Sequence, residues 1–312
     1  MSYKIGIIGA ARRHQGTGPY IARTFAALGH EISGIVGTSE QSTQQALADL
    51  SSHYGINTQG YTSFDRLLQQ HDLDIIVIAS PPGSHLDYLE LGAKNKLHIF
   101  CEKPLWWPEN NQLELAKYEQ TLQAIIQQSK ANNRYIHLNT QWPYTLKDFS
   151  RLFPSTIINN EIKQFAMHLS PQSSGVSMLV DAASHGLSML YQLVGAGNLN
   201  HIEHQQISNG ALINFDYEHR QGITQSTLKF IQSNETPKPA SYQINGKTVN
   251  RTVSLPEYQI QLQSDLQTIA IQDPLDASIR DFLASIDAGI ESDESALMLG
   301  ARHLYQLIEN YK

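Results

Sequence analysis

A glutamate and a lysine stand together at the end of an apolar segment, in the run KLHIFCEKPL that ends at Leu105. Short apolar runs of this kind are typical of buried strands, so Glu102 and Lys103 should lie at the carboxyl end of a strand. A positioned lysine amine can donate a hydrogen bond or a proton to an oxygen that changes oxidation state. The pair therefore predicts acid–base chemistry at the sheet edge where ligands bind.

A second acid–base pair is spaced for one face of a helix. Asp181 and His185 are four residues apart, so on a helix they project from the same side. A carboxylate beside an imidazole orients the ring and raises its basicity. An isolated pair of this spacing is usually a surface ion pair. This one is embedded in the apolar stretch VSMLVDAASHGLSMLYQLV, which favours a buried face or a cleft and hence a functional role.

The turn after the first apolar run is rich in glycine. It reads GAARRHQGTG from Gly9 to Gly18, with Pro19 suited to the first turn of a helix. Such turns let the backbone approach a pyrophosphate at a helix N-terminus. We interpret Gly9 and Gly18 as the first and last glycines of a loop four residues longer than the usual six-residue motif. Strict spacing would instead place Ala11 and His14 at the other glycine positions. The predicted phosphate contacts are Gly9, Ala10, Ala11, Arg12, Arg13, Gly16 and Gly18.

The end of the second strand bears on the choice of cofactor. NAD-selective domains usually carry an acid there, whereas this chain has Thr38 and Ser39. Arg12 and Arg13 could pair with a 2′-phosphate, or they could be solvated loop charges. Glu40 could still reach the ribose. The pattern favours NADP and leaves NAD possible.

The first 140 residues alternate strand and helix. This order predicts an α/β fold with a Rossmann doubly wound parallel sheet and its site at the carboxyl ends of the strands. The predicted strands are 3–9, 31–37, 74–80, 97–101 and 135–140, and the predicted helices are 19–29, 39–54, 62–70, 84–95 and 109–131.

Residues 141–312 have a different pattern, which predicts an α+β domain with an open, mainly antiparallel sheet. Period-two segments lie between about 210 and 263, and Asn245-Gly246 is a hairpin signal between two of them. Helices are predicted at 176–194, 275–289 and 294–311, the last of which could pack back on the first domain. The domains are thus 1–140 for dinucleotide binding and 141–312 for substrate binding and oligomerisation.

Composition excludes several classes of protein. The net charge of −7 argues against a dedicated nucleic-acid binder, and the lack of a long apolar run predicts no membrane partner. The only cysteine, Cys101, forbids an intrachain disulfide and fits a reducing compartment. The first strand begins too early to leave room for a signal peptide, so we expect a cytoplasmic protein. His201 and His204 lack further ligands at metal-site spacing, so no metal is predicted.

Together these motifs resemble the Gfo/Idh/MocA oxidoreductase family. The likeness rests on the Rossmann opening, on IASPPGSHLDYLELGAKNKLHIFCEKPL (residues 78–105) and on the helix with Asp-x-x-x-His at 174–195. It covers most of the chain, whereas 198–265 matches only in its strand-rich character. Two departures are the long phosphate loop and Gln141, because many relatives carry an arginine after the equivalent of YIHLNT.

The resemblance implies roles for single residues. Glu102 is expected near the nicotinamide ribose, and Lys103 between the cofactor and the substrate oxygen. His185 is expected to be the general acid/base at that oxygen, with Asp181 contacting substrate or orienting the ring. Because Lys103 and His185 belong to different domains, the implied active site is the interdomain cleft. The turn expected to pass along the cofactor contains Ser80, Pro81 and His85.

The implied activity is hydride transfer between a nicotinamide cofactor and a hydroxyl or carbonyl carbon of a small polar substrate, with sugars or cyclitols as the expected class. Two alternatives stay open: a reductase of an imine or other biosynthetic intermediate, and a cofactor-sensing protein without turnover.

The second sheet predicts an assembly. We expect the helices at 176–194 and 275–289 to cover one of its faces. The other face would then be exposed and partly apolar, and such a face tends to be an interface. Relatives pair through this sheet, so a homodimer is expected, with a homotetramer possible. The apolar residues assigned to the exposed face are Leu212, Phe215, Tyr217, Leu228, Phe230 and Ile231.

Overall fold

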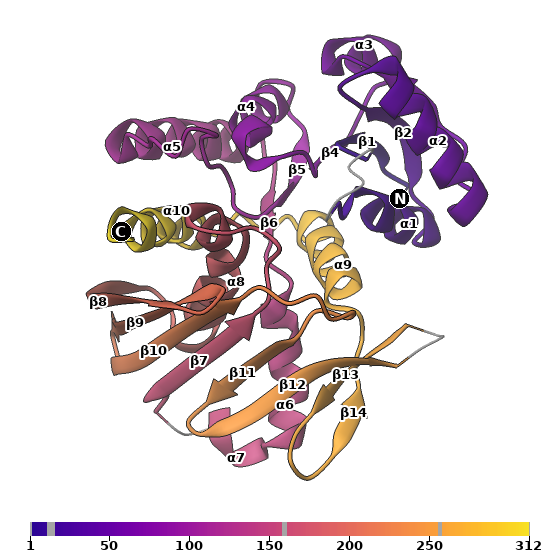
Figure 1. The fold of residues 1–312 in the computed structure, drawn as a ribbon. Coiled ribbons are helices and arrows are strands. Elements are labelled where there is room, and N and C mark those ends of the chain that lie inside the picture. Colours follow the sequence, from indigo (N-terminus) through magenta and orange to yellow (C-terminus); the bar gives the residue numbers. More distant parts are fainter. Residues whose placement is uncertain (1, 11–15, 158–160, 255–257, 312) are drawn as a thin grey trace. The chain divides into compact units, whose positions relative to one another are not determined.

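The computed structural model describes residues 2–10, 16–157, 161–254 and 258–311. Its internal contacts divide the chain into two units, each with its own sheet (Figure 1). Unit 1 comprises Met1–Asn139 and Ser278–Glu294, and unit 2 comprises Thr140–Ala277 and Ser295–Lys312.

Unit 1 is built on a parallel sheet of six strands in the order β3-β2-β1-β4-β5-β6. This is the Rossmann order, in which strands are added outward in one direction from β1 to β3 and in the opposite direction from β4 to β6. Every residue of β4 and β5 is buried, and because successive side chains point to opposite faces, both faces are covered. The strands are β1 (Lys4–Ile8), β2 (Glu31–Val36), β3 (Gln59–Tyr61), β4 (Ile75–Ile78), β5 (His98–Glu102) and β6 (Ile136–Asn139).

The helices of unit 1 follow the predicted ranges with one clear difference. The predicted helix over 109–131 begins only at Leu115. The indole of Trp107 donates to Asn111 Oδ1, and Asn111 N–H donates to the Pro108 carbonyl, so these residues form a turn instead. The helical elements are α1 (Gly18–Ala27), α2 (Glu40–Tyr54), α3 (Phe64–Gln70), the short 3₁₀ segment η1 (Pro82–Ser84), α4 (His85–Lys94) and α5 (Leu115–Ala131).

Unit 2 contains an eight-stranded sheet in the order β14-β13-β12-β11-β7-β10-β9-β8. Its pairs are antiparallel except for β7 and β10, which are parallel, so the predicted mainly antiparallel sheet is confirmed. Asn245 and Gly246, with φ of 47° and 79°, form the predicted hairpin turn between β11 and β12. The strands are β7 (Gln164–Leu169), β8 (Gly197–Ile207), β9 (Gly210–His219), β10 (Gly222–Ile231), β11 (Ala240–Ile244), β12 (Lys247–Ser254), β13 (Gln259–Gln263) and β14 (Thr268–Ala270).

One face of this second sheet is covered by helices of the same unit. Gly186 of α8 shows how close the packing is, because a Cβ built there would lie 2.4 Å from Leu228 of β10. His303 of α10 donates from Nε2 to the Gly197 carbonyl. The other helical elements of the unit are η2 (Trp142–Thr145), α6 (Leu146–Leu152) and α7 (Pro154–Ile157), besides α8 (Val176–Val194) and α10 (Glu294–Glu309).

Helix α9 (Pro274–Asp287) is divided between the units. From Ser278 onwards it belongs to unit 1, where Phe282 packs edge-on against Phe25 and Phe100. The expectation that the helix over 275–289 covers the second sheet is therefore wrong for most of its length. An amphipathic pattern shows that a helix has an apolar face but not which sheet receives it.

The apolar side chains assigned to an exposed sheet face are mostly buried. Phe215 and Tyr217 of β9, like Leu228 and Phe230 of β10, are at most 3% exposed and lie on the helix-covered face. The assignment placed residues an odd number of positions apart in one strand on the same face, whereas such side chains point to opposite sides of the sheet. Leu212 and Ile231 lie on the open face, where most of their neighbours are polar, including Asn214, Gln225 and Thr227.

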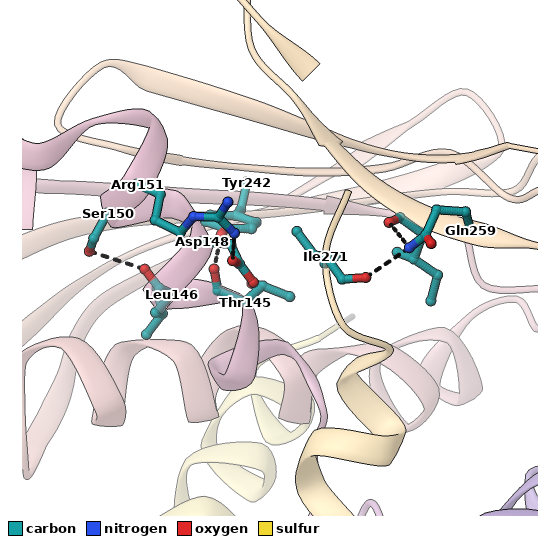
Figure 2. A network of polar contacts seen from close by, with 9 residues as sticks. Thr145, Leu146, Asp148, Ser150, Arg151, Tyr242, Gln259 and Ile271 are labelled. Atoms are coloured by element: carbon teal, nitrogen blue, oxygen red, sulfur yellow. Dashed lines mark hydrogen bonds and ion pairs between the residues drawn. The ribbon is translucent and has the colours of Figure 1, made fainter. Parts of the chain in front are cut away.

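Polar contacts tie the start of unit 2 to its sheet, as Figure 2 shows. The Tyr242 hydroxyl of β11, fully buried, lies 3.0 Å from Thr145 Oγ1 at the end of η2. Arg151 donates to the buried Asp148 carboxylate at 2.7 Å within α6.

Among the residues that the structure describes, no helix combines the length and hydropathy that a bilayer span requires.

Candidate active site

The phosphate-loop glycines stand where the backbone allows no side chain. Gly9, directly after β1, has φ +86°, and a Cβ built there would lie 2.6 Å from the Ser80 backbone nitrogen. A Cβ on Gly18, the first residue of α1, would lie 2.9 Å from Ala10 Cα. The chain thus leaves a cradle of bare backbone at the carboxyl end of the sheet, which suits a pyrophosphate. Of the predicted contacts in this loop, Ala11, Arg12 and Arg13 lie outside the described residues.

A cavity of about 790 Å³ opens beside this loop. It runs from Ala10 and Gly16 past Ser39 at the tip of β2 to Tyr20 and Tyr54 on α1 and α2. The Ser39 hydroxyl accepts from the Ser42 N–H at 3.2 Å and caps α2, while Thr38 is exposed. The volume of the cavity is typical of small-molecule sites. Its described lining offers hydroxyl and amide groups together with the Asp49 carboxylate and the His53 imidazole, at the place where the 2′ position of a ribose would be read.

His85 joins the turns that follow β4 and β5. Its ring is fully buried, with Nδ1 2.9 Å from the Pro104 carbonyl oxygen and Nε2 2.8 Å from the Ser80 carbonyl oxygen. Ser80 is also buried, its hydroxyl 2.7 Å from that of Ser84, while Pro81 is exposed. The His85 ring therefore contacts the backbone of both turns.

The Glu102–Lys103 pair lies at the carboxyl end of β5. Glu102 is buried and accepts a hydrogen bond of 2.5 Å from Asn139 Nδ2, its register partner on β6, while Lys103 is half-buried. Burial and, to a lesser extent, the Glu102 charge raise the pKa of the Cys101 thiol well above its ordinary value, so this cysteine is a poor nucleophile. Asn139 was not among the predicted site residues, although a polar residue at the carboxyl end of a parallel strand is itself a signal.

Helix α8 carries the other acid–base pair. Asp181 and His185 are half-buried and flank a face of small and apolar residues, including Ala182 and Gly186, that packs into unit 2. Asp181 accepts a hydrogen bond from the Ser173 hydroxyl. His185 Nδ1 lies 2.7 Å from the Thr140 carbonyl oxygen. A carbonyl can only accept, so Nδ1 carries a proton and Nε2 of the neutral ring is the basic nitrogen.

The structure thus brings the predicted residues together in two groups. Unit 1 places Gly9, Ser80, His85 and Glu102-Lys103 at the carboxyl ends of β1, β4 and β5. Unit 2 holds Asp181 and His185 on one helix. The first group suits cofactor binding and proton donation, and the second suits general acid–base chemistry.

A protein-family sequence profile matches the first part of the chain. Residues 3–130 match the profile described as "Oxidoreductase family, NAD-binding Rossmann fold", Gfo/Idh/MocA. A curated relative, D-xylose 1-dehydrogenase (NADP(+)) 2 of Haloferax volcanii, is 38% identical over 76 residues. That alignment covers 24% of this chain and 22% of the relative's length.

Solved structures share the fold over nearly the whole chain. Scyllo-inositol dehydrogenase of Lactobacillus casei, solved with NAD(H) and scyllo-inositol, superposes with a TM-score of 0.73 at 14% identity, covering 100% of this chain and 97% of that one. A 3-ketoreductase of Actinomadura kijaniata, solved with NADP, gives a TM-score of 0.67 at 16% identity, covering 99% and 96%. At such identities the likeness concerns the fold.

Proposed function

Because residues 3–130 belong to the Gfo/Idh/MocA oxidoreductase family, as the motifs indicated, we propose that the chain is an NAD(P)-dependent oxidoreductase with Lys103 and His185 in proton transfer. The observation that carries the proposal is Lys103 at the carboxyl end of β5 in a sheet whose phosphate loop leaves bare backbone at Gly9. The nicotinamide, when bound, would accept or supply a hydride. The oxygen on the same substrate carbon must then lose or gain a proton.

His185 is suited to move that proton. Its Nδ1–H donates to Thr140, which leaves Nε2 to take a proton from a hydroxyl or, once protonated, to return it to a carbonyl oxygen. The Lys103 ammonium can donate a hydrogen bond to the same oxygen and stabilise negative charge as it develops there. Asp181, held by Ser173, would contact the substrate.

Cofactor binding is the first test. Fluorescence titrations with NADPH and NADH should reveal binding of at least one, and failure of both at millimolar concentration would contradict the proposal. Gly9→Ala should abolish binding, because its Cβ would meet the Ser80 backbone. Gly29→Ala is the matched control, since Gly29 has a similar φ of +85° but nothing within 4 Å of its Cβ position.

We further propose NADP as the preferred cofactor. The tip of β2 offers Thr38 and Ser39 where NAD-selective domains carry an acid, and the adjoining cavity leaves room for a 2′-phosphate. Replacing Arg12 and Arg13 together by Ala should weaken NADPH far more than NADH, by about 1.5–3 kcal/mol for each lost charged contact. Arg66→Ala is the control, because Arg66 is exposed on α3 and does not line that cavity. Equal weakening of both cofactors would instead point to pyrophosphate contact.

The proposed substrates are sugars or cyclitols, in line with what the relatives' names report for those proteins. A panel of aldoses, cyclitols and their ketones should show turnover with the bound cofactor, and mass spectrometry of co-purifying molecules would narrow the class. Turnover of imines alone would favour the reductase alternative. Tight cofactor binding without any turnover would favour the sensing alternative.

We also propose that the chain forms a homodimer through the open face of the second sheet. That face is largely polar, so the contact would rest on hydrogen bonds of residues such as Asn214 and Thr227, which already bond each other at 2.8 Å. Light scattering at micromolar concentration should give twice the chain mass of 34.9 kDa, and a mass near 34.9 kDa would contradict the proposal. Thr227→Arg should yield monomers, whereas Gln192→Arg on the exposed side of α8 should not.

A further inference from the structure

The residue that follows Thr140 has an unusual backbone conformation. Gln141 has φ 62° and ψ −54°, and the Trp142 N–H donates to the Thr140 carbonyl at 2.7 Å. A hydrogen bond between residues two apart, with positive φ at the middle residue, defines the rare and strained form of the γ-turn. Residues with side chains seldom adopt it, because the Cβ crowds the backbone at positive φ.

The turn is held in place by buried neighbours on its carboxyl side. Trp142 is only 8% exposed, and its ring meets that of Tyr242 edge-on at 6.0 Å. The Arg251 guanidinium lies 6.0 Å from the centre of the same indole. Thr145 Oγ1 donates to the Trp142 carbonyl at 2.8 Å and also lies beside the Tyr242 hydroxyl drawn in Figure 2. Such over-determined surroundings are what a strained conformation needs to persist.

The strained turn aims one atom at the acid–base histidine. The Thr140 carbonyl oxygen, which accepts from Trp142, is also the acceptor for His185 Nδ1 at 2.7 Å. A carbonyl oxygen has two lone pairs, so it can accept both hydrogen bonds. The Thr140 carbonyl lies in the peptide plane that joins Thr140 to Gln141. The orientation of that plane relative to the following residues is set by φ of Gln141, so the turn fixes the direction of the carbonyl.

We infer that Gln141 is a positioning residue: its γ-turn presents the Thr140 carbonyl to His185 and holds the imidazole in the Nδ1–H tautomer, with Nε2 as the reacting nitrogen. This inference rests on the proposed function for its catalytic meaning, although the tautomer itself does not. The required feature is the backbone conformation rather than the amide of the glutamine. A glycine at position 141 can adopt it without steric cost, whereas proline, with φ near −65°, cannot.

The tautomer can be read directly. Histidine labelled with ¹⁵N gives distinct long-range ¹H–¹⁵N correlation patterns for the two neutral tautomers, recorded at about pH 9, well above the ordinary histidine pKa. The His185 signals are assigned by their loss in His185→Asn. The wild-type protein should show the Nδ1–H form at His185. An Nε2–H form in the wild type would overturn the inference without the need for any variant.

Two substitutions then separate the turn from the side chain. Gln141→Gly should keep the Nδ1–H tautomer and a kcat within about threefold of wild type, because glycine retains the turn. Gln141→Pro should shift His185 towards the Nε2–H form and lower kcat about tenfold or more, with cofactor affinity unchanged. A Gln141→Pro protein with a native circular dichroism spectrum and an unchanged tautomer would refute the inference. So would a Gln141→Gly protein as impaired as the proline variant, since the side chain would then be what matters.

The same spectra separate this inference from the proposed function. An Nδ1–H tautomer that Gln141→Pro alters supports the positioning role even if no tested substrate turns over. In that case the failure would concern the substrate or the reaction.

Discussion

His85 in unit 1 and His185 in unit 2 are both helix residues whose rings contact backbone carbonyls, yet their surroundings differ. His85 is fully buried and has a carbonyl oxygen within 2.9 Å of each ring nitrogen. His185 is half-buried, and a carbonyl holds its Nδ1. Carbonyls on both sides restrain a ring and the two chain segments it joins. At His185 the carbonyl on Nδ1 sets the tautomer, which makes Nε2 the basic nitrogen. The same residue type thus suits two roles. In unit 1 it forms a clamp, defined here as the His85 ring with the Ser80 and Pro104 carbonyls, and in unit 2 it suits an acid–base group.

The largest effect should come from the half-buried histidine. His185→Ala should lower kcat by about two orders of magnitude or more, the scale of losing a positioned acid–base group. Cofactor affinity should survive, because His185 belongs to unit 2 and the phosphate loop to unit 1. His201→Ala is the control, since His201 is exposed on β8 and its ring pairs with the carboxylate of Asp216 on β9. Full activity of His185→Ala at all pH values would show that its assigned role is wrong.

Lys103→Ala should cause a loss of turnover of similar size, again about two orders of magnitude, because it removes the proposed hydrogen-bond donor at the substrate oxygen. Lys94→Ala provides a comparison on the exposed end of α4. Steady-state kinetics with the best substrate of the panel would measure both. A Lys103→Ala enzyme within a few-fold of wild type would remove Lys103 from the reaction.

The clamp should affect cofactor affinity as well as turnover. His85→Phe keeps a ring of similar shape but removes the imidazole N–H, so the Ser80 or Pro104 carbonyl that accepts from it loses its donor. We expect a stability loss of about 1–3 kcal/mol and weaker cofactor binding, since both turns lie at the carboxyl end of the sheet. Urea unfolding and NADPH titration would measure these effects. If His85→Phe bound cofactor normally and lost only kcat, His85 would resemble His185 and the contrast between the two would fail.

The smallest expected effect concerns pH and a buried histidine of unit 1. Burial lowers the pKa of His137 to about 4 from an ordinary value of 6.5; its Nε2 lies 2.8 Å from Ser278 Oγ and its ring stacks on Phe100. The folded state therefore favours the neutral ring, and the unfolded state takes up a proton first as the pH falls. The stabilisation is complete above pH 6.5 and declines as the pH falls towards 4, by about 2 kcal/mol at pH 5.

Chemical denaturation between pH 8 and pH 5 tests this prediction. His137→Phe should be less stable at pH 8, because Ser278 loses its partner, but should lose less further stability on acidification than the wild type. An identical acid dependence in the two proteins would show that His137 does not contribute. His185 variants, in contrast, should change turnover far more than stability.

Most of the fold could be predicted from local sequence patterns. Buried parallel strands read as short apolar runs, and α8 was predicted with the bounds that the structure has, Val176–Val194, because its apolar stretch is long and ends at glycines. Four strands were missed, β3, β7, β8 and β14. The strands β3 and β14 have only three residues each, and β8 exposes charged and polar residues along much of its length, so its pattern has no clear period. The glycines of the phosphate loop could be placed because a close backbone approach requires that residue type.

By itself, the sequence indicated the resemblance to the family whose profile matches residues 3–130, five of the six strands of unit 1 with the helices between them, and the residue types that could do acid–base chemistry, since each of these depends on neighbours along the chain. Only the tertiary structure decided that Phe282 of α9 packs in unit 1, that Phe215 and Tyr217 face inward, and that Asn139 holds Glu102. The same is true of the Thr140 carbonyl on His185. These contacts join residues 37 to 257 positions apart or depend on which face of an element is covered, and periodicity along a chain carries neither kind of information.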